Sequence, residues 1–391
     1  MKTLYAQNLL VLTLAVGVLL AQTATAEITI ETVPVGNAGN ANDPYNGYVY
    51  GAVSYDYRIG KYEVTLNQYT AFLNAVAATD PYGLYNYLMG QEVTSLGITR
   101  SGVSGSYTYS VIGSGNRPVA LVSWFNAARF VNWLHNGQPI GAQAAGTTET
   151  GAYTLDGALS GLDFPRNATA KYGLPSENEW YKAAYHQPAA QGGDVDNYWR
   201  YPTRSNAQPN SRNGSASDPN SANFYYDDSI ANGHNGGYAV NNSPILAAIN
   251  FLTDVGAFSA AASFYGTFDQ GGNVWEWNDA VIGSTRGWRG GGWDSVGFRL
   301  EAGNRETFPV SYAGFRIVIP PVVALPVLIS SQSGNTLTFS WTGNFKLQAQ
   351  TNSLSSVSGT NWSDYPSGGN SPVIVEMDTI SSSVFFRLST P

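Results

Sequence analysis

Apolar residues recur at helical spacing in two stretches of the first half of the chain. Thr65 and Ser123 each precede such a stretch, and a hydroxyl at that position can cap the N–H groups at a helix start. The second stretch ends before Gly137, a residue type favoured just past a helix end. We predict two helices, whose apolar faces comprise Leu66, Tyr69, Phe72, Leu73 and Val76 in the first and Trp124, Ala128, Val131 and Leu134 in the second.

A third helix is predicted from residues 175–180, Pro-Ser-Glu-Asn-Glu-Trp. Ser176 and Glu179 have the spacing of a capping box, in which the hydroxyl accepts from the N–H of Glu179 and the carboxylate reaches back. This local role explains Glu179, so we assign it no catalytic role.

From about Pro320 the pattern changes to an alternation of apolar and polar residues with a period of two, interrupted by prolines. Such alternation is typical of strands, and it is clearest in residues 336–341, 345–348 and 384–388. We predict a small all-β sandwich module over residues 325–391. The region before it, residues 27–320, is irregular and rich in Gly, Asn and Ser, and forms the main domain.

The N-terminus has the pattern of a secretory signal peptide over residues 1–26. Lys2 is followed by an apolar run from Leu9 to Leu20 and by Ala24-Thr25-Ala26, a small-x-small cleavage pattern. An uncleaved anchor is the alternative, but the run is shorter than the roughly 20 residues that span a bilayer. We expect a secreted, periplasmic or cell-surface protein that starts near Glu27, with no transmembrane segment after cleavage.

Composition limits the possible partners and chemistry. The net charge of −8 argues against a nucleic-acid partner, because phosphate binding needs clustered Lys and Arg. Only 12% of residues are charged, while 25 tyrosines and 10 tryptophans suit a compact fold with an aromatic-rich surface. The chain has no cysteine, which excludes disulfides and every thiol-dependent reaction.

The most informative stretch runs from Phe268 to Trp277 and contains a Gly-Gly pair that permits a tight backbone path. Glu276 lies between two tryptophans, and a carboxylate in such surroundings needs an arginine or a metal as partner. Two further motifs follow it, Arg289-Gly290-Gly291-Gly292-Trp293 and Gly314-Phe315-Arg316.

These motifs resemble those of the sulfatase-modifying-factor family, typified by the formylglycine-generating enzyme. The resemblance covers about residues 27–320 and implies an α+β, loop-rich, C-type-lectin-like fold. Six motifs occur in the family's order: Tyr62-Glu63-Val64-Thr65 with Tyr69; Pro118-Val119 leading to Val122-Ser123-Trp124; Leu174 to Trp180; Gly272 to Trp277; Arg289-Gly290-Gly291; and Gly314-Phe315-Arg316.

In the namesake enzyme of this family, two cysteines shortly after Arg-Gly-Gly bind copper(I) and oxidise a substrate cysteine to formylglycine. The corresponding residues here, 293–300, read Trp-Asp-Ser-Val-Gly-Phe-Arg-Leu, and Gly292 stands where the family enzyme has serine. Copper(I) prefers thiolate and thioether ligands. We therefore expect no copper and no formylglycine-generating activity.

The resemblance also implies a structural calcium ion beneath the loop that contains Glu276. Its ligands would be the Asp269 side chain, the Gly272 and Val274 carbonyls and the Glu276 carboxylate, all oxygen donors of the kind that Ca²⁺ prefers. The alternative is that Glu276 pairs with Arg289, Arg299 or Arg316 and that Asp269 caps a turn. A second family site would involve Asn223 and the Phe224 carbonyl, and its later acidic ligand has no clear match.

Two function classes follow from these observations. The first is a non-catalytic, calcium-stabilised module that binds a glycan or a protein, with Trp275, Trp293 and Asp294 as the candidate ligand surface. The second is an oxidoreductase of the same family with a non-thiol metal site, using Asp294 and a histidine. His135, His186 and His234 are widely separated, and the acidic runs at residues 194–197 and 227–228 are typical of solvated loops.

Overall fold

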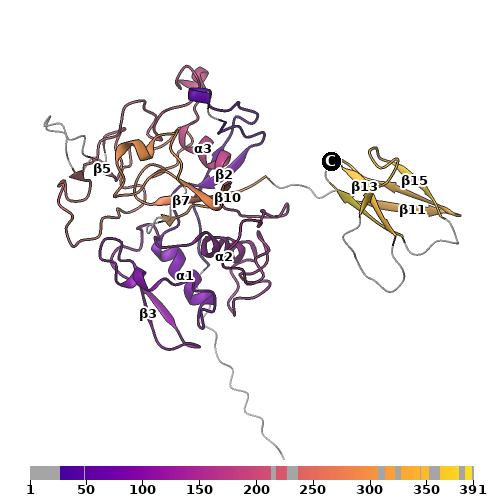
Figure 1. The fold of residues 1–391 in the computed structure, drawn as a ribbon, viewed down its shortest axis with the longest axis horizontal. Coiled ribbons are helices and arrows are strands. Elements are labelled where there is room, and N and C mark those ends of the chain that lie inside the picture. The colour runs from indigo at the N-terminus through magenta and orange to yellow at the C-terminus, as the bar shows by residue number, and fades with distance from the viewer. Residues whose placement is uncertain are drawn as a thin grey trace, which may run out of the picture. The chain divides into compact units, whose positions relative to one another are not determined.

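The computed structural model describes residues 27–47, 49–212, 217–226, 237–306, 313–321, 327–343, 345–351, 362–377 and 384–389. The chain divides into two compact units, Met1–Pro320 and Pro321–Pro391 (Figure 1). The predicted signal peptide and His234 lie outside the described residues.

The three predicted helices are confirmed, each with its predicted cap. They are α1 (Leu66–Val76), α2 (Trp124–His135) and α3 (Glu177–Tyr185). The side chains of Thr65, Ser123 and Ser176 accept hydrogen bonds from the third backbone N–H of each helix. The α1 cap is a full capping box as well, because Gln68 accepts from the Thr65 N–H at 2.9 Å. Short 3-10 segments occur at η1 (Tyr45–Gly47), η2 (Tyr87–Gly90), η3 (Ala189–Gln191) and η4 (Gly297–Leu300).

Two three-stranded sheets form the centre of the first unit. In one, β2 pairs antiparallel with both β1 and β10, so the first and last strands of the unit lie on either side of it. In the other, β7 pairs antiparallel with β8 and parallel with β9. The strands are β1 (Thr32–Val35), β2 (Tyr57–Gly60), β7 (Trp275–Ile282), β8 (Thr285–Arg289), β9 (Ala313–Gly314) and β10 (Val318–Ile319).

Two smaller antiparallel pairs complete this unit: β3 (Ile98–Ser101) with β4 (Thr108–Val111), and β5 (Tyr225–Tyr226) with β6 (Gly237–Tyr238). In Figure 1, α3 lies on one side of β2, β7 and β10, and α1 and α2 lie on the other. The central strands are therefore covered on both sides.

Aromatic side chains from distant segments form the main core. Phe130 of α2 has its ring centroid 5.4 Å from that of Phe72 in α1 and 5.3 Å from that of Phe315, both edge to face. All three side chains are fully buried. Phe315 directly precedes Arg316, so this core fixes the segment that carries that arginine. Among the described residues, no helix is long and apolar enough to cross a bilayer.

The second unit consists of two three-stranded antiparallel sheets. Phe339 in one sheet and Phe386 in the other have ring centroids 4.5 Å apart, and Leu347 is fully buried. The strands expected at residues 336–341, 345–348 and 384–388 are confirmed in this unit. The sheets are β11 (Ile329–Ser333), β12 (Thr336–Ser340) and β15 (Val373–Glu376), and β14 (Ser363–Asp364), β13 (Lys346–Thr351) and β16 (Val384–Ser389).

A buried ion pair connects α2 to the loop that follows it. Arg129 donates from Nε and Nη2 to the two oxygens of Glu149 at 2.7 and 2.9 Å, and both side chains are nearly inaccessible. Burial alone would raise the pKa of Glu149, but the hydrogen bonds from Arg129 and the Gly157 N–H outweigh it and lower the pKa. The pair therefore stabilises the fold above the carboxylate's unfolded-state pKa, and this contribution is lost as pH falls through the depressed folded value.

We expect Glu149→Gln to lower the free energy of unfolding by about 3–5 kcal/mol, because it leaves the Arg129 guanidinium buried without a counter-charge. The matched control is Glu31→Gln, which breaks an ion pair to Lys61 whose glutamate side chain is 62% exposed and should cost less than about 1 kcal/mol. Urea denaturation at neutral pH measures both. Equal losses of stability in the two variants would contradict the assignment of Arg129 and Glu149 as a stabilising buried ion pair.

Candidate functional site

The Glu276 carboxylate is buried and held by protein donors. Arg316 donates from Nε to Oε2 and from Nη2 to Oε1, both at 2.6 Å, and Trp180 Nε1 donates to Oε2 at 2.8 Å. A carboxylate has about four positions that can accept a hydrogen bond, and these three bonds leave about one of them unused. The pairing with Arg316, one of the alternatives that the sequence leaves open, is therefore present in the structure.

Arg316 uses all of its N–H groups in this position. Besides Glu276, it donates to the carbonyls of Gly60 at 2.9 Å, Lys61 at 3.3 Å and Phe268 at 2.8 Å. A guanidinium has five N–H donors, and these five bonds account for each of them. One side chain thus connects the end of β2, the Phe268 segment and the start of β7.

Two further carboxylates lie in the same electrostatic environment. Asp269 Oδ2 accepts from the Gly256 N–H at 2.6 Å, and burial raises the pKa of Asp269 to about 6. Glu63 is 2% exposed, and burial together with the Asp269 and Glu276 charges raises its pKa well above the usual range. The sequence places Glu63 only in a family motif and gives no sign of its burial.

The remaining predicted calcium donors lie in one tight turn, and the second predicted site adjoins it. A Cβ on Gly272 would meet the Asn223 carbonyl oxygen at 2.2 Å, so only glycine is accommodated there. Asn223 O accepts from the Asn273 N–H at 2.7 Å, and the Phe224 carbonyl accepts from the Ser211 hydroxyl. Asn223, Phe224 and Val274 are all buried. The structure therefore brings the two predicted calcium loops into direct contact.

The candidate ligand surface requires a correction. Trp275 is 5% exposed and Trp293 3% exposed, and the Trp293 ring stacks on Phe251 with centroids 4.8 Å apart. Asp294 is exposed. Because their apolar rings pack into the interior, the two tryptophans are part of the core, and only Asp294 of the three residues is at the surface.

The two glutamates at the start of α3 have roles that the capping box does not explain. Glu179 accepts from Arg166 at 2.9 and 3.0 Å and from the Tyr55 hydroxyl at 2.9 Å, in addition to its capping bond. Glu177 binds Arg289 at 2.7 Å and Arg305 at 2.8 Å. The expectation that capping alone explains Glu179 is therefore wrong.

The two described histidines are each in contact with other groups. His186 Nδ1 lies 2.7 Å from the Tyr265 hydroxyl, and burial lowers the pKa of His186 to about 4. His135 Nδ1 accepts from the Lys171 N–H at 3.1 Å. Within the described part of the chain, no three or more His, Cys, Asp or Glu side chains are grouped to hold a metal ion.

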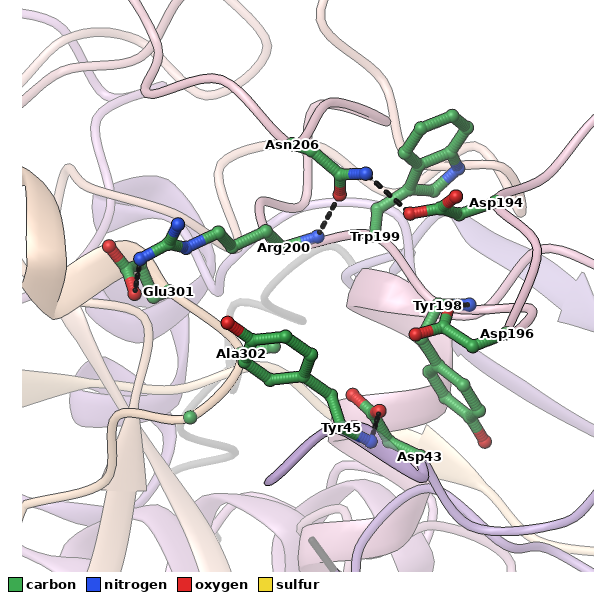
Figure 2. A pocket seen from close by; sticks show the side chains of 11 residues that line it. Asp43, Tyr45, Asp194, Asp196, Tyr198, Trp199, Arg200, Asn206, Glu301 and Ala302 are labelled. Carbon is green, nitrogen blue, oxygen red and sulfur yellow. Dashed lines mark hydrogen bonds and ion pairs between the residues drawn. The ribbon is translucent and has the colours of Figure 1, made fainter. Parts of the chain in front are cut away.

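A cavity of about 220 Å³ opens beside α3, lined by residues from three separate segments. Figure 2 shows side chains arranged around this open space: Asp43 and Tyr45 on one side, Asp194 and Asp196 on another, and Arg200 and Glu301 on a third. The remaining lining residues are Tyr198, Trp199, Asn206, Ala302 and Gly303. We call it the α3 pocket.

Hydrogen bonds hold the polar side chains of the α3 pocket. Asp43 accepts from the Tyr181 hydroxyl at 2.5 Å and from the Tyr45 N–H at 2.8 Å, and burial raises the pKa of Asp43. Arg200 donates to Glu301 at 3.0 Å, and Asn206 donates to Asp194 (Figure 2). The pocket thus presents fixed acceptors beside aromatic rings.

The sequence identifies residues 194–197 as an acidic run but expects it to be solvated. The structure places Asp194 and Asp196, both half-buried, in the wall of the α3 pocket, which is open to solvent. Asp43 and Glu301 give no signal in the sequence, since they are more than one hundred residues from this run.

We expect Glu276→Gln to lower the free energy of unfolding by about 3–5 kcal/mol, because it removes the counter-charge of the buried Arg316 guanidinium. The loss should be the same in calcium and in chelator, since it comes from a bond within the protein. Thermal melting in both buffers measures it. A loss seen only in calcium would show that the carboxylate serves a metal instead.

We compared the chain with curated proteins and with solved structures. A search of the curated proteins finds no match. Among solved structures, the chain is similar to a crystal structure of CarF (24% identity, 75% of this chain and 98% of that chain, TM-score 0.41). It is also similar to Treponema denticola variable protein 1 (20% identity, 76% and 97%, TM-score 0.40) and to PvdO from Pseudomonas aeruginosa (17% identity, 74% and 90%, TM-score 0.32).

The sequence profile of the sulfatase-modifying factor enzyme 1-like domain matches residues 25–320. This range contains all six motifs and both central sheets of the first unit. The fold is the loop-rich α+β fold that the resemblance implies, with its short strands in several small sheets. The chain therefore belongs to the sulfatase-modifying factor family.

Proposed function

We propose that this protein is a secreted, calcium-stabilised member of the family that binds a glycan in the α3 pocket and catalyses no oxidation. The observation that carries the proposal is the pairing of a polar, aromatic-walled pocket with the complete absence of cysteine from the chain.

The region that corresponds to the family's copper site supports the non-catalytic part of the proposal. Ser295 stands in this stretch, and its hydroxyl accepts from the Gly292 N–H at 2.9 Å. Trp293 is packed in the core. Oxygen and indole groups do not replace the thiolates that copper(I) prefers.

The lining of the α3 pocket supports a glycan as the ligand. Carboxylates and amides accept and donate hydrogen bonds of the kind that sugar hydroxyls exchange, and aromatic faces pack against the C–H faces of sugar rings. A protein partner would instead bury about 800 Å² of its surface against a broad face, whereas this pocket is a small concave site of about 220 Å³.

The charge of the pocket also limits which kinds of sugar could bind there. Asp43, Asp194, Asp196 and Glu301 contribute four carboxylates, and Arg200 is the one cationic side chain in the lining. Acidic sugars would be repelled by this excess of negative charge. We therefore propose a neutral or amino-bearing oligosaccharide.

Three carboxylates support the calcium part of the proposal. The charges of Asp269 and Glu276 both raise the pKa of the Glu63 carboxyl, and the charge of Arg316 lowers it. If ionised, these three carboxylates exceed the charge of one guanidinium, and a divalent cation with oxygen ligands would balance the difference.

We expect the purified protein to bind neutral or amino-bearing oligosaccharides on a glycan array, and Tyr45→Ala to weaken that binding at least about tenfold without lowering stability. Tyr45 is 49% exposed at the pocket, and the matched control is Tyr87→Ala, which is 60% exposed in η2 outside the pocket and should bind normally.

Three results would overturn this proposal: no glycan binding, unchanged binding in Tyr45→Ala, or oxygen consumption with thiol peptides. Consumption of oxygen together with a retained redox metal would favour the oxidoreductase alternative.

A further inference from the structure

Glu63 is a buried carboxylate without a hydrogen-bonding partner among the described residues. It follows β2 and lies two residues before the N-cap of α1, and only 2% of it is exposed. Neither Oε1 nor Oε2 receives a hydrogen bond from another residue. Burying an ionised carboxylate in this way is costly unless a cation or a proton neutralises it.

The nearest arginine does not supply the missing bonds. All five N–H groups of Arg316 are directed to Glu276 and to three backbone carbonyls, so none remains for Glu63. Lys61, two residues earlier, donates instead to Glu31 at the surface at 2.8 Å. Neither of these two cationic side chains therefore donates a hydrogen bond to the Glu63 carboxylate.

Asp269 is brought toward Glu63 by the backbone. The Phe268 N–H donates to the Lys61 carbonyl at 2.9 Å, and the Tyr62 and Phe268 rings have centroids 5.5 Å apart. Segments 61–63 and 268–269 thus run beside each other next to Arg316. The charge of Asp269 is one of the causes that raise the pKa of the Glu63 carboxyl.

Glu63 also lines a cavity of about 560 Å³ that is open to solvent. The same cavity is lined by Asp254, Asn67, Asn116 and Gln68, whose side chains carry oxygen atoms. The cavity borders Glu63, whose carboxylate oxygens themselves lie beneath its surface. Carboxylate, amide and water oxygens are the donors that Ca²⁺ takes.

We propose that Glu63 is a direct ligand of a divalent cation, Ca²⁺ by its donor set, shared with Asp269 between the end of β2 and the Phe268 segment. Glu276 then serves mainly as the partner of Arg316. This inference rests on the calcium part of the proposed function, and it assigns to the ion a carboxylate outside the set of calcium ligands that the resemblance implies.

The test compares Ca²⁺ binding by calorimetry and thermal melting, with and without chelator, in the full mature protein. Glu63→Gln should lower the Ca²⁺ affinity more than about tenfold and reduce the calcium-induced rise in Tm. In chelator its Tm should equal or exceed that of the unchanged protein, because the substitution removes a buried charge without a partner. Asp269→Asn should also weaken Ca²⁺ binding.

The matched control is Glu31→Gln, which removes a carboxylate of the same cavity that is 62% exposed and already paired with Lys61, and it should leave the Ca²⁺ affinity unchanged. Full Ca²⁺ affinity in Glu63→Gln would overturn this inference alone. A Glu63→Gln variant that is destabilised or unfolded in chelator would overturn it too, since Glu63 would then make a bond within the protein.

Absence of Ca²⁺ binding by the unchanged protein would overturn both this inference and the calcium part of the proposed function. Glycan binding on the array is measured separately, so it tests the glycan part of the proposed function independently of calcium.

Discussion

The first unit depends on one guanidinium group. Arg316 lies just after the aromatic core residue Phe315 and before β10, and its side chain is fully buried. Its five donors reach the end of β2, the Phe268 segment and Glu276 at the start of β7. Because these bonds go to three different stretches of the chain, this side chain fixes the relative position of segments that are distant in the sequence.

This arrangement also explains how a loop-rich domain without disulfides keeps a defined structure. Other buried ion pairs act in the same way: Arg129 with Glu149, Arg166 with Glu179, and Arg289 with Glu177. In each, a planar guanidinium binds a carboxylate from another loop or helix. Charged residues are few, and these pairs place several of them in the interior, where they specify which loops meet.

The family scaffold and the family chemistry are separate in this protein. The motifs that shape the turn around Gly272 and the Arg316 pair are present, while the thiols of the copper site are absent. The α3 pocket lies elsewhere, in segments around residues 43, 196 and 301 that none of the six motifs includes. The ligand binding that we propose for this pocket therefore depends on other residues than those at the positions of the family's copper site.

The sequence predicts local features well and long-range partners poorly. Helix caps depend on residues three positions apart, so Thr65, Ser123 and Ser176 are identifiable without a structure. The choice of Arg316 over Arg289 as the partner of Glu276 depends on how distant loops fold. The sequence alone therefore leaves three arginines as possible partners. The burial of Trp293 and the position of Asp196 were missed because period and spacing do not determine burial in irregular segments.

The central claim is that the geometry of Arg316, and not only its charge, holds the first unit together. The most direct test is the free energy of unfolding of Arg316→Lys, which keeps the positive charge but has three donors on one atom in place of five in a planar fork. We predict a loss of at least about 3 kcal/mol, as for a broken buried ion pair. Stability within about 0.5 kcal/mol of the unchanged protein, the range of ordinary surface substitutions, would contradict the claim.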